Sequence, residues 1–275
     1  MPSDTVPTSP RKGWLETFRT MPNDSKPKTL IVALALCLVC SVLVSTAAVK
    51  LQPLQQRNQE LDRKKIILEV AGLLKPGASI DELFKQVELK VVDLSTGEYV
   101  DSIDANQFDQ RQAAKDPAQS MQIPPEKDIA QIRRRARYAT VYLVKEGDKV
   151  KSVILPVHGY GLWSTMYAFL AVEQDANTIF GLQFYEQRET AGLGSEVANP
   201  TWQAKWKGKV VYDEAGKPKI RVIKGTVAPN DPEAQFKVDG LAGATITANG
   251  VTNLIHYWLG PEGFGTYLKK FRSAR

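Results

Sequence analysis

The longest uninterrupted run of apolar positions lies near the start of the chain. Leu30 to Val49 are 20 consecutive positions without a charge, and a lysine lies just outside each end. A helix of that length spans about 30 Å at about 1.5 Å per residue, which matches the hydrocarbon core of a bilayer. A cleaved signal peptide is the alternative, but such peptides have apolar cores of about 7–15 residues and short basic leaders. The run therefore predicts a membrane-spanning helix over residues 30–50.

The regions on either side of the span differ in pattern. Residues 1–29 are polar and rich in proline, which predicts a mostly disordered leader. Residues 51–74 combine long polar side chains with a later apolar face and predict a helix that Pro76 and Gly77 end. Residues 80–86 predict a second, short helix with Ser79 as its N-cap.

Strand patterns then replace the helical ones. Polar residues 101–128 show little periodicity and predict a long surface loop, whereas residues 248–259 carry a wide apolar face and predict the last helix. Strands that do not alternate regularly with helices favour an α+β fold over a parallel α/β sheet. The predicted strands are residues 87–94, 138–144, 150–157, 179–185 and 219–223, with Glu146-Gly147-Asp148 as a hairpin turn after the second.

Composition narrows the class of protein without identifying it. The 275 residues are 43% apolar and 24% charged, as in an ordinary folded domain, and the net charge of +6 is mild. Basic residues are not interleaved with base-stacking aromatics, so nucleic-acid binding is not expected. One cluster of arginines is best interpreted as a solvated surface, and binding of a phosphate or an acidic lipid is the alternative. Its members are Arg133, Arg134, Arg135 and Arg137.

Both cysteines, Cys37 and Cys40, lie inside the apolar run at a spacing that places them on one helix face. Half of a metal or cluster site is one interpretation. Two small side chains that pack in lipid is the favoured one, because four ligands are usual and the chain has no further cysteine. Lysine and arginine are equally frequent near both ends of the span, so charge does not decide its orientation.

Familiar catalytic motifs are absent from the sequence. It contains no Walker A pattern, no GxGxxG after a predicted strand, no HExxH and no GxSxG. The two histidines are His158 and His256, and His256 lies within the last predicted helix. Neither a metal site nor a Ser-His-Asp triad is therefore expected.

Two glycine-containing segments that follow strands are candidate binding loops. Residues 158–164, HGYGLWS, offer close backbone approach beside the flat face of Trp163, and a bend with a core tryptophan is the alternative. Residues 189–196, ETAGLGSE, combine glycines with hydroxyl and carboxylate groups, and an ordinary surface turn is the alternative.

A third segment, residues 239–249 with the sequence DGLAGATITAN, leads into the last predicted helix. Its small residues leave the backbone accessible, and free N–H groups at a helix start favour a phosphate. The alternative is a helix start capped by Thr247, which needs no ligand. Thr247 is the better N-cap candidate because the clearest helical pattern begins at Ala248, but the helix start alone does not separate the hydroxyls of Thr245 and Thr247 as binding groups.

The sequence DGLAGAT resembles the flavinylation motif Dxx(S/T)GAT of respiratory subunits that carry a covalent flavin. The apolar run, GLW at residues 161–163 and ETxGLG at residues 189–194 occur in the same order. The chain therefore resembles the C subunits of Na⁺-translocating NADH:quinone oxidoreductases and, more distantly, the G subunits of Rnf complexes. Two positions depart from the pattern, Ala242 in place of Ser or Thr and Ala191 in place of a common Pro. Neither is the acceptor threonine, so flavinylation is still expected.

The resemblance implies a cofactor and its site. It places FMN in a phosphodiester bond to Thr245, beside Gly243 and Ala244. A separate flavin transferase is expected to make this bond, because a threonine hydroxyl is a weak nucleophile. The isoalloxazine pocket is expected to be lined by Leu162, Trp163, Glu189, Thr190, Gly192 and Leu193.

The resemblance also implies a topology and a role. Residues 1–29 are expected to be a cytoplasmic leader, residues 30–50 a single helix across the bacterial inner membrane, and residues 51–275 a periplasmic FMN-binding domain. The chain would then be an electron-carrying subunit of a translocase, not catalytic alone. Other subunits of the complex would pass electrons from NADH to ubiquinone through it, coupled to Na⁺ export.

Two alternatives stay open at this point. The chain could be the FMN subunit of an Rnf-type complex, which feeds ferredoxin or NAD. The long region after the span and EQRET at residues 186–190, in place of a histidine-containing EHxET, favour the quinone-reductase family instead. It could also be an anchored scaffold protein without flavin, which the absence of a flavin absorbance band would indicate.

Overall fold

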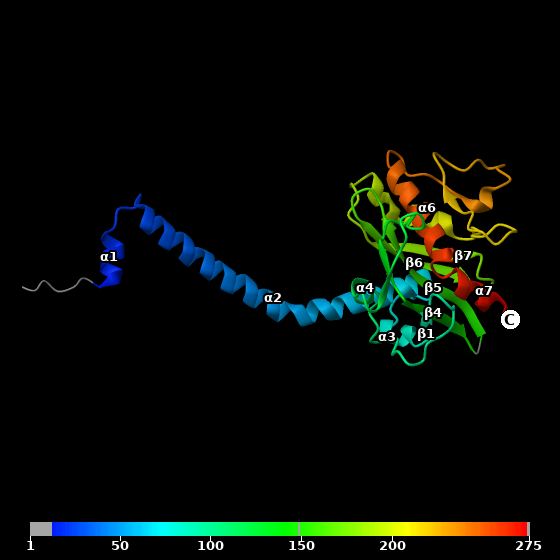
Figure 1. Ribbon diagram of the computed structural model, residues 1–275, viewed down its shortest axis with the longest axis horizontal. Helices are drawn as coiled ribbons and strands as arrows, with labels where there is room; N and C mark the ends of the chain where they lie inside the picture. The colour runs from blue at the N-terminus through cyan, green and yellow to red at the C-terminus, as the bar shows by residue number, and fades with distance from the viewer. Residues whose placement is uncertain (1–12, 148, 274–275) are drawn as a thin grey trace, which may run out of the picture. The chain divides into compact units, whose positions relative to one another are not determined.

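A computed structural model describes residues 13–147 and 149–273 of the chain (Figure 1). The chain divides into two compact units, residues 1–60 and residues 61–275. The predicted disorder of residues 1–12 and the Asp148 position of the predicted hairpin turn lie outside the described residues.

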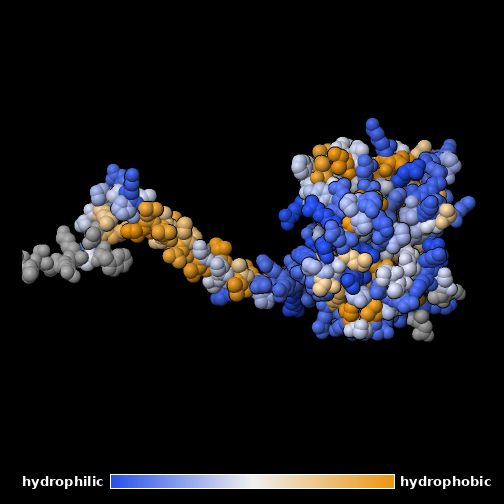
Figure 2. All heavy atoms as spheres, in the orientation of Figure 1, coloured by the Kyte–Doolittle hydropathy of each residue, from blue (hydrophilic) through white to orange (hydrophobic). Residues whose placement is uncertain are grey.

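The first unit consists of helix α1, Trp14–Thr20, and most of helix α2, Lys26–Val70. The leader is therefore partly helical, which corrects the prediction of disorder for its later part. Helix α2 is 45 residues long and contains the whole apolar run (Figure 2). By length and composition it is able to cross a membrane, and the apolar side chains of the run are exposed. Pro53 lies inside this helix, so the predicted span and the predicted helix after it are continuous.

Helix α2 ends earlier than the sequence suggested. Its last residue is Val70, and Gly72 adopts φ +67°, a conformation that glycine adopts without strain. The Leu73 N–H donates to the Leu68 carbonyl at 2.9 Å, which closes the helix end. The stop signal is therefore Gly72 and not Pro76 and Gly77. Helix α3 is shorter than predicted, Ile80–Phe84, and Ser79 makes no side-chain capping bond.

One five-stranded antiparallel sheet organises the second unit, in the order β1-β4-β5-β6-β7 (Figure 1). Four strands agree closely with the prediction, whereas the pattern analysis missed β6. The strands are β1 Val87–Asp93, β4 Tyr138–Glu146, β5 Lys149–Tyr160, β6 Thr165–Glu173 and β7 Ile179–Glu186. Strands β4 to β7 are consecutive neighbours, so the hairpin turn from β5 to β6 lies at one end of the sheet.

Two expectations for the polar middle of the chain are wrong. The predicted loop at residues 101–128 contains helix α4, Gln110–Lys115, capped by Asp109, and strand β2, Ser120–Gln122. Strand β2 pairs with β3, Arg134–Ala136. Arg135 within β3 is 6% exposed, so the arginine cluster is not a uniformly solvated face.

Both faces of the sheet are covered by apolar packing. The end of α2, with Ile67 and Leu68, packs with Tyr142 and Phe169 on one face. On the other face, helices α6, Thr245–Leu259, and α7, Gly265–Ser273, pack with the sheet in the larger core. Burial on both faces explains why β4 reads as a nearly continuous apolar run without alternation.

Short elements connect β7 to α6. They are the 3₁₀ helices Gly194–Ala198, Ala204–Trp206 and Ala234–Phe236, helix α5 Pro200–Gln203, and the parallel pair β8 Arg221–Val222 and β9 Lys237–Val238. Strand β8 is all that forms of the strand predicted at residues 219–223. Helix α6 then crosses the end of β5 at close range, because a Cβ at Gly250 would lie 2.5 Å from the Tyr160 carbonyl oxygen. The start of α6 is therefore held near the turn between β5 and β6.

Candidate functional site

The three candidate segments meet at the end of the sheet where β5 turns into β6. The turn itself is residues 161–164, the second segment follows β7, and the third is the start of α6. His158, Gly159 and Tyr160 belong to β5, so the first candidate segment begins inside the strand and not after it. Contacts from Glu189 and Gly243 join the segments directly.

The carboxylate of Glu189 is the centre of the junction. It accepts hydrogen bonds from three consecutive backbone N–H groups, those of Leu162 at 3.0 Å, Trp163 at 3.0 Å and Ser164 at 3.1 Å. The Thr247 hydroxyl donates a fourth bond, 2.7 Å from Oε2. Glu189 is 8% exposed. One buried side chain therefore ties together the β5–β6 turn, the segment after β7 and helix α6.

Two opposing effects set the charge of this carboxyl. Burial raises the pKa of Glu189, and the hydrogen bonds from Thr247 and the three backbone N–H groups outweigh it, so the pKa lies below its usual value. Glu189 is thus an ionised carboxylate whose charge is spread over four donors. Such a carboxylate holds its neighbours in place, because removing it would leave the buried Thr247 hydroxyl and three part-buried N–H groups without their acceptor.

Apolar side chains around this junction remain exposed. Trp163 is 65% exposed, which excludes the alternative of a core tryptophan. Its indole Nε1 donates to the Thr190 hydroxyl at 3.1 Å, so the ring is fixed although it faces solvent. Leu162, Leu193 and Ile246 are also exposed, at 39%, 41% and 57%. Exposed apolar side chains held close to a polar junction are typical of a ligand site.

The third segment has a different helix start from the one predicted. Helix α6 begins at Thr245 and not at Ala248, and its N-cap is Ala244, which offers no side-chain cap. Thr247 is therefore not the N-cap. Its side chain is 1% exposed and its hydroxyl bonds to Glu189 instead. Thr245 is exposed at the first position of the helix.

The loop before Thr245 is joined to the segment after β7. Gly243 adopts φ +70°, and a Cβ there would lie 2.9 Å from Cδ2 of Leu193. Gly192 and Thr190 are exposed in the same segment as Leu193. The structure thus brings all nine predicted site residues into three segments in mutual contact. Ser164 and Ile246 lie within the candidate segments but were not among the predicted site residues, and the Thr247–Glu189 bond was not predicted.

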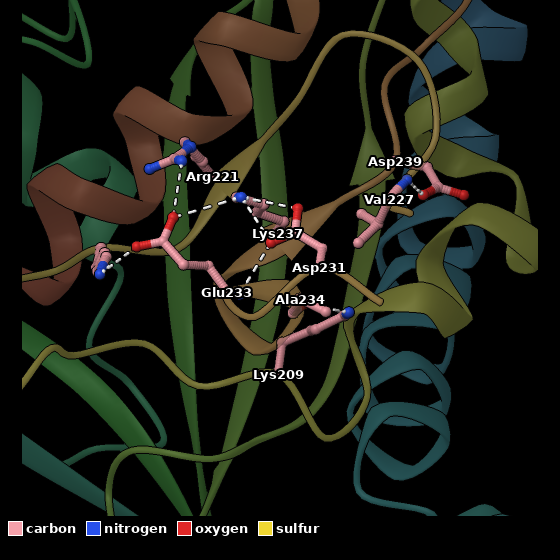
Figure 3. A network of polar contacts seen from close by, with 9 residues as sticks. Lys209, Arg221, Val227, Asp231, Glu233, Ala234, Lys237 and Asp239 are labelled. Atoms are coloured by element: carbon pink, nitrogen blue, oxygen red, sulfur yellow. Dashed lines mark hydrogen bonds and ion pairs between the residues drawn. The ribbon is translucent and has the colours of Figure 1, made fainter. Parts of the chain in front are cut away.

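Asp239, the first residue of the motif, is bound within the protein. Its carboxylate accepts from Lys205 Nζ at 2.6 Å and from the Val227 N–H at 2.8 Å, and its carbonyl accepts from the Trp202 indole at 2.8 Å. Figure 3 shows the Val227 contact beside a separate charge network in which Lys237 bonds Asp231 and Glu233. These bonds shape the chain that leads to Thr245.

Both histidines contact neighbouring groups of the domain. Nε2 of His256 lies 2.6 Å from the Ile220 carbonyl oxygen, as expected for a packed side chain. His158 stacks on Tyr167, with ring centroids 5.4 Å apart. Among the described residues, no group of three or more His, Cys, Asp or Glu side chains is placed to hold a metal ion.

The domain that holds these three segments is of the FMN-binding class, and one long apolar helix precedes it. A family described as FMN-binding domain matches residues 161–260, which include the β5–β6 turn, the segment after β7 and all of α6. This match begins at Gly161 and ends at Gly260, immediately after the last helical residue, Leu259.

Relatives of the whole chain narrow this class to one family. The chain is 53% identical to the C subunit of the Na(+)-translocating NADH-quinone reductase of Vibrio vulnificus strain YJ016 over 253 residues, which cover 92% of this chain and 98% of the relative. The same subunit from Pseudomonas aeruginosa is 50% identical over 255 residues, covering 91% and 98%. The chain belongs to the NqrC family, the C subunits of Na⁺-translocating NADH-quinone reductases, and so to a translocase complex.

Solved structures agree with this family. The crystal structure of Shewanella oneidensis NqrC superposes with a TM-score of 0.72 at 37% identity and covers 78% of this chain and 99% of that chain. The crystal structure of the corresponding subunit from Parabacteroides distasonis gives a TM-score of 0.61 at 27% identity, with 79% and 96% covered. The predicted α+β fold with one long apolar N-terminal helix is confirmed.

Proposed function

We propose that Thr245 carries FMN through a phosphodiester bond. The observation that carries the proposal is the exposed hydroxyl at the first position of α6, on a helix start without a side-chain cap. The backbone N–H groups of a first helical turn and the positive end of the helix dipole favour a phosphate. Gly243 and Ala244, the two residues before Thr245, have no long side chains of their own to cover its hydroxyl.

The surroundings of Thr245 suit the flavin ring as well. Leu162, Trp163 and Leu193 offer exposed apolar surface, and Thr190 and Gly192 lie in the same segment as Leu193. The buried Glu189 carboxylate accepts hydrogen bonds from the backbone of the β5–β6 turn and so holds Leu162 and Trp163 in place. Burying one large apolar side chain against a ring stabilises the complex by about 1.5–3 kcal/mol. Bound FMN supplies the redox chemistry, since it accepts and returns electrons, and the chain binds and orients it.

The place of the chain in the complex follows from this carrier role. We infer that other subunits oxidise NADH and reduce ubiquinone, that two electrons pass between them for each NADH, and that this chain relays them. The complex would couple this transfer to Na⁺ export. A covalent bond would keep the FMN from diffusing away into the compartment that holds the domain.

The proposed topology has three parts. Residues 1–29 form the cytoplasmic leader, residues 30–50 cross the inner membrane within α2, and residues 51–275 form the periplasmic domain. The continuous apolar helix supports the crossing. A flavin transferase would attach the FMN after the domain reaches the periplasm, since the threonine hydroxyl needs activation by another enzyme.

The test uses the full chain, expressed in a host that contains a flavin transferase. On a denaturing gel under ultraviolet light, the unmodified sequence should give a fluorescent band, and intact mass should show one added FMN. Thr245→Val removes the hydroxyl at nearly constant volume and should give no band. Thr247→Ser is the matched control and should keep it. A fluorescent Thr245→Val band, or a dark band for all chains including the unmodified one, would overturn the proposal.

A further inference from the structure

The hydrogen bond between Thr247 and Glu189 joins two halves of the site that are far apart in sequence. Thr247 lies two residues after Thr245 on α6. Glu189 accepts hydrogen bonds from the backbone of Leu162 and Trp163 in the β5–β6 turn. We propose that Thr247 and Glu189 are positioning residues, whose hydrogen bond fixes the acceptor threonine relative to the ring platform, residues 162–164. This inference rests on the proposed function for its meaning, but its structural part is testable without any flavin.

The first step of the argument is the bonding of the ring platform. In the turn from β5 to β6, the Gly161 N–H donates to the Ser164 carbonyl at 2.8 Å. The next three N–H groups donate to the Glu189 carboxylate instead. Three successive N–H groups that converge on one anion form a nest, a motif that binds free anions in other proteins. Here the anion is a side chain of the same chain, so the conformation of the platform depends on it.

The second step is that the junction leaves no room for another arrangement. A Cβ at Gly161 would lie 2.7 Å from Oε1 of Glu189, and a Cβ at Gly194 would lie 2.6 Å from the Thr247 hydroxyl oxygen. Glu189 and Thr247 are 8% and 1% exposed. The two side chains are therefore packed from both sides, and a displaced Glu189 would collide with the backbone that it now supports.

The third step connects the junction to the acceptor. A helix is rigid over two residues, so any rotation or shift of the α6 start that moves Thr245 also moves the Thr247 hydroxyl. Such a movement breaks the bond to Glu189, and the buried charge loses one of its four donors. Loss of a donor to a buried charge is costly. The bond therefore opposes any movement of Thr245 relative to the ring platform.

The structural arm of the test is hydrogen exchange, measured by mass spectrometry on the flavin-free full chain in detergent. The reporter peptide covers the platform, and strand β4 serves as the internal control. Thr247→Val keeps the shape of the side chain but removes the donor, and should speed exchange at residues 162–164 on the order of tenfold, as expected for a lost bond to a charged acceptor. Thr247→Ser keeps the donor and should exchange like the unmodified chain. Equal platform exchange in Thr247→Val and Thr247→Ser would overturn the proposal.

The functional arm uses the flavinylated full chain. Thr247→Val should keep its covalent flavin, because Thr245 is intact, but should show lower flavin fluorescence anisotropy than Thr247→Ser. Glu189→Gln should lower it further, since three N–H groups lose their charged acceptor. Unchanged anisotropy in both Thr247→Val and Glu189→Gln would contradict the positioning role. If the unmodified chain carries no flavin, the proposed function fails, whereas the exchange result still decides whether the junction holds the platform.

Discussion

The indole Nε1 of Trp163 donates a hydrogen bond to the hydroxyl of Thr190 across 3.1 Å. This bond joins the β5–β6 turn to the segment after β7 on the solvent side, whereas Glu189 joins the same two segments from the buried side. A large, exposed aromatic ring is thereby held in one orientation. Rigid aromatic surfaces bind flat ligands with little loss of side-chain entropy.

The first prediction concerns this ring. Trp163→Ala should leave the covalent bond at Thr245 intact but weaken ring packing by about 1.5–3 kcal/mol, the value of one large apolar contact. Flavin fluorescence and the redox titration should change. Trp163→Phe, which keeps an aromatic face but loses the bond to Thr190, should have an intermediate effect. An unchanged spectrum and titration in Trp163→Ala would show that Trp163 does not contact the flavin.

A second prediction concerns Gly161. An added Cβ would lie 2.7 Å from the Glu189 carboxylate, so Gly161→Ala should destabilise the domain by about 1–3 kcal/mol through overpacking. Denaturant unfolding measured by tryptophan fluorescence would show a lower midpoint. Gly13→Ala is the matched control, because a Cβ at Gly13 meets nothing within 4 Å. Equal midpoints for the two variants would mean that the junction adapts to the extra methyl group.

A third prediction concerns pH. Burial, and then the positive charge of Arg111, lower the pKa of His158 to about 4. The unfolded chain, with a histidine pKa near 6.5, binds this proton first as the pH falls, so the free energy of unfolding decreases between pH 6.5 and 4. The decrease from this group is at most about 3 kcal/mol, and none is expected above pH 7.

The control for this pH dependence is His158→Phe, which keeps a ring against Tyr167 and Trp258 but does not titrate. Because all carboxyl groups are common to both proteins, the difference between their unfolding curves isolates His158. The free energy of unfolding of the unmodified chain should fall steadily, relative to that of the variant, from pH 7 to pH 4. Parallel curves over this range would show that the histidine is accessible to protons in the folded protein.

The fourth prediction concerns topology. A periplasmic reporter fused after Arg275 should be active, and a cytoplasmic reporter fused at the same position should not. The flanking lysine and arginine residues are equally frequent on both sides of the apolar run, so the expectation comes from the family and not from charge. The opposite reporter pattern would refute the periplasmic domain and, with it, the proposed route of flavin attachment.

The fifth prediction concerns the two cysteines of the apolar run. Both Cys37 and Cys40 are exposed in the structure of this chain and are not joined to each other. Replacing both with serine should leave the flavin content of the chain unchanged. Loss of an iron signal from the assembled complex in this double variant would point to a cluster shared with another subunit.

The sequence was sufficient for the features that depend on local pattern. The apolar run, four strands of the main sheet and the three candidate segments are each visible within a few neighbouring residues. Strand β6 was missed because it is buried on both faces, which removes the alternation that marks a strand. The end of α2 was misplaced because both Gly72 and Gly77 are able to adopt positive φ, and the sequence does not show which one ends the helix.

The site was predictable as a set of residues but not as an arrangement. Thr247 has the residue type and position of an N-cap, and local rules assign it that role. Its actual partner, Glu189, is 58 positions away in the sequence. Arg135 was likewise predicted to be solvated because charged residues surround it in the sequence. In the structure it lies in β3, which pairs with β2, and its side chain is buried. Long-range partners of this kind are set by the tertiary fold, which a single sequence does not reveal.

The order of strands in the main sheet also determines which strand edges are open to pairing with another molecule. An edge strand offers unpaired backbone groups that recruit strands of other molecules and begin aggregation. At the edge formed by β1, Glu88 and Lys90 carry charges, and Lys145 pairs with Glu88 at 2.6 Å. At the other edge, Ile179 of β7 is already bonded to the backbone of Gly208 and Lys209. A second copy of the domain therefore meets charge at one edge and an occupied strand end at the other, which disfavours strand exchange between copies.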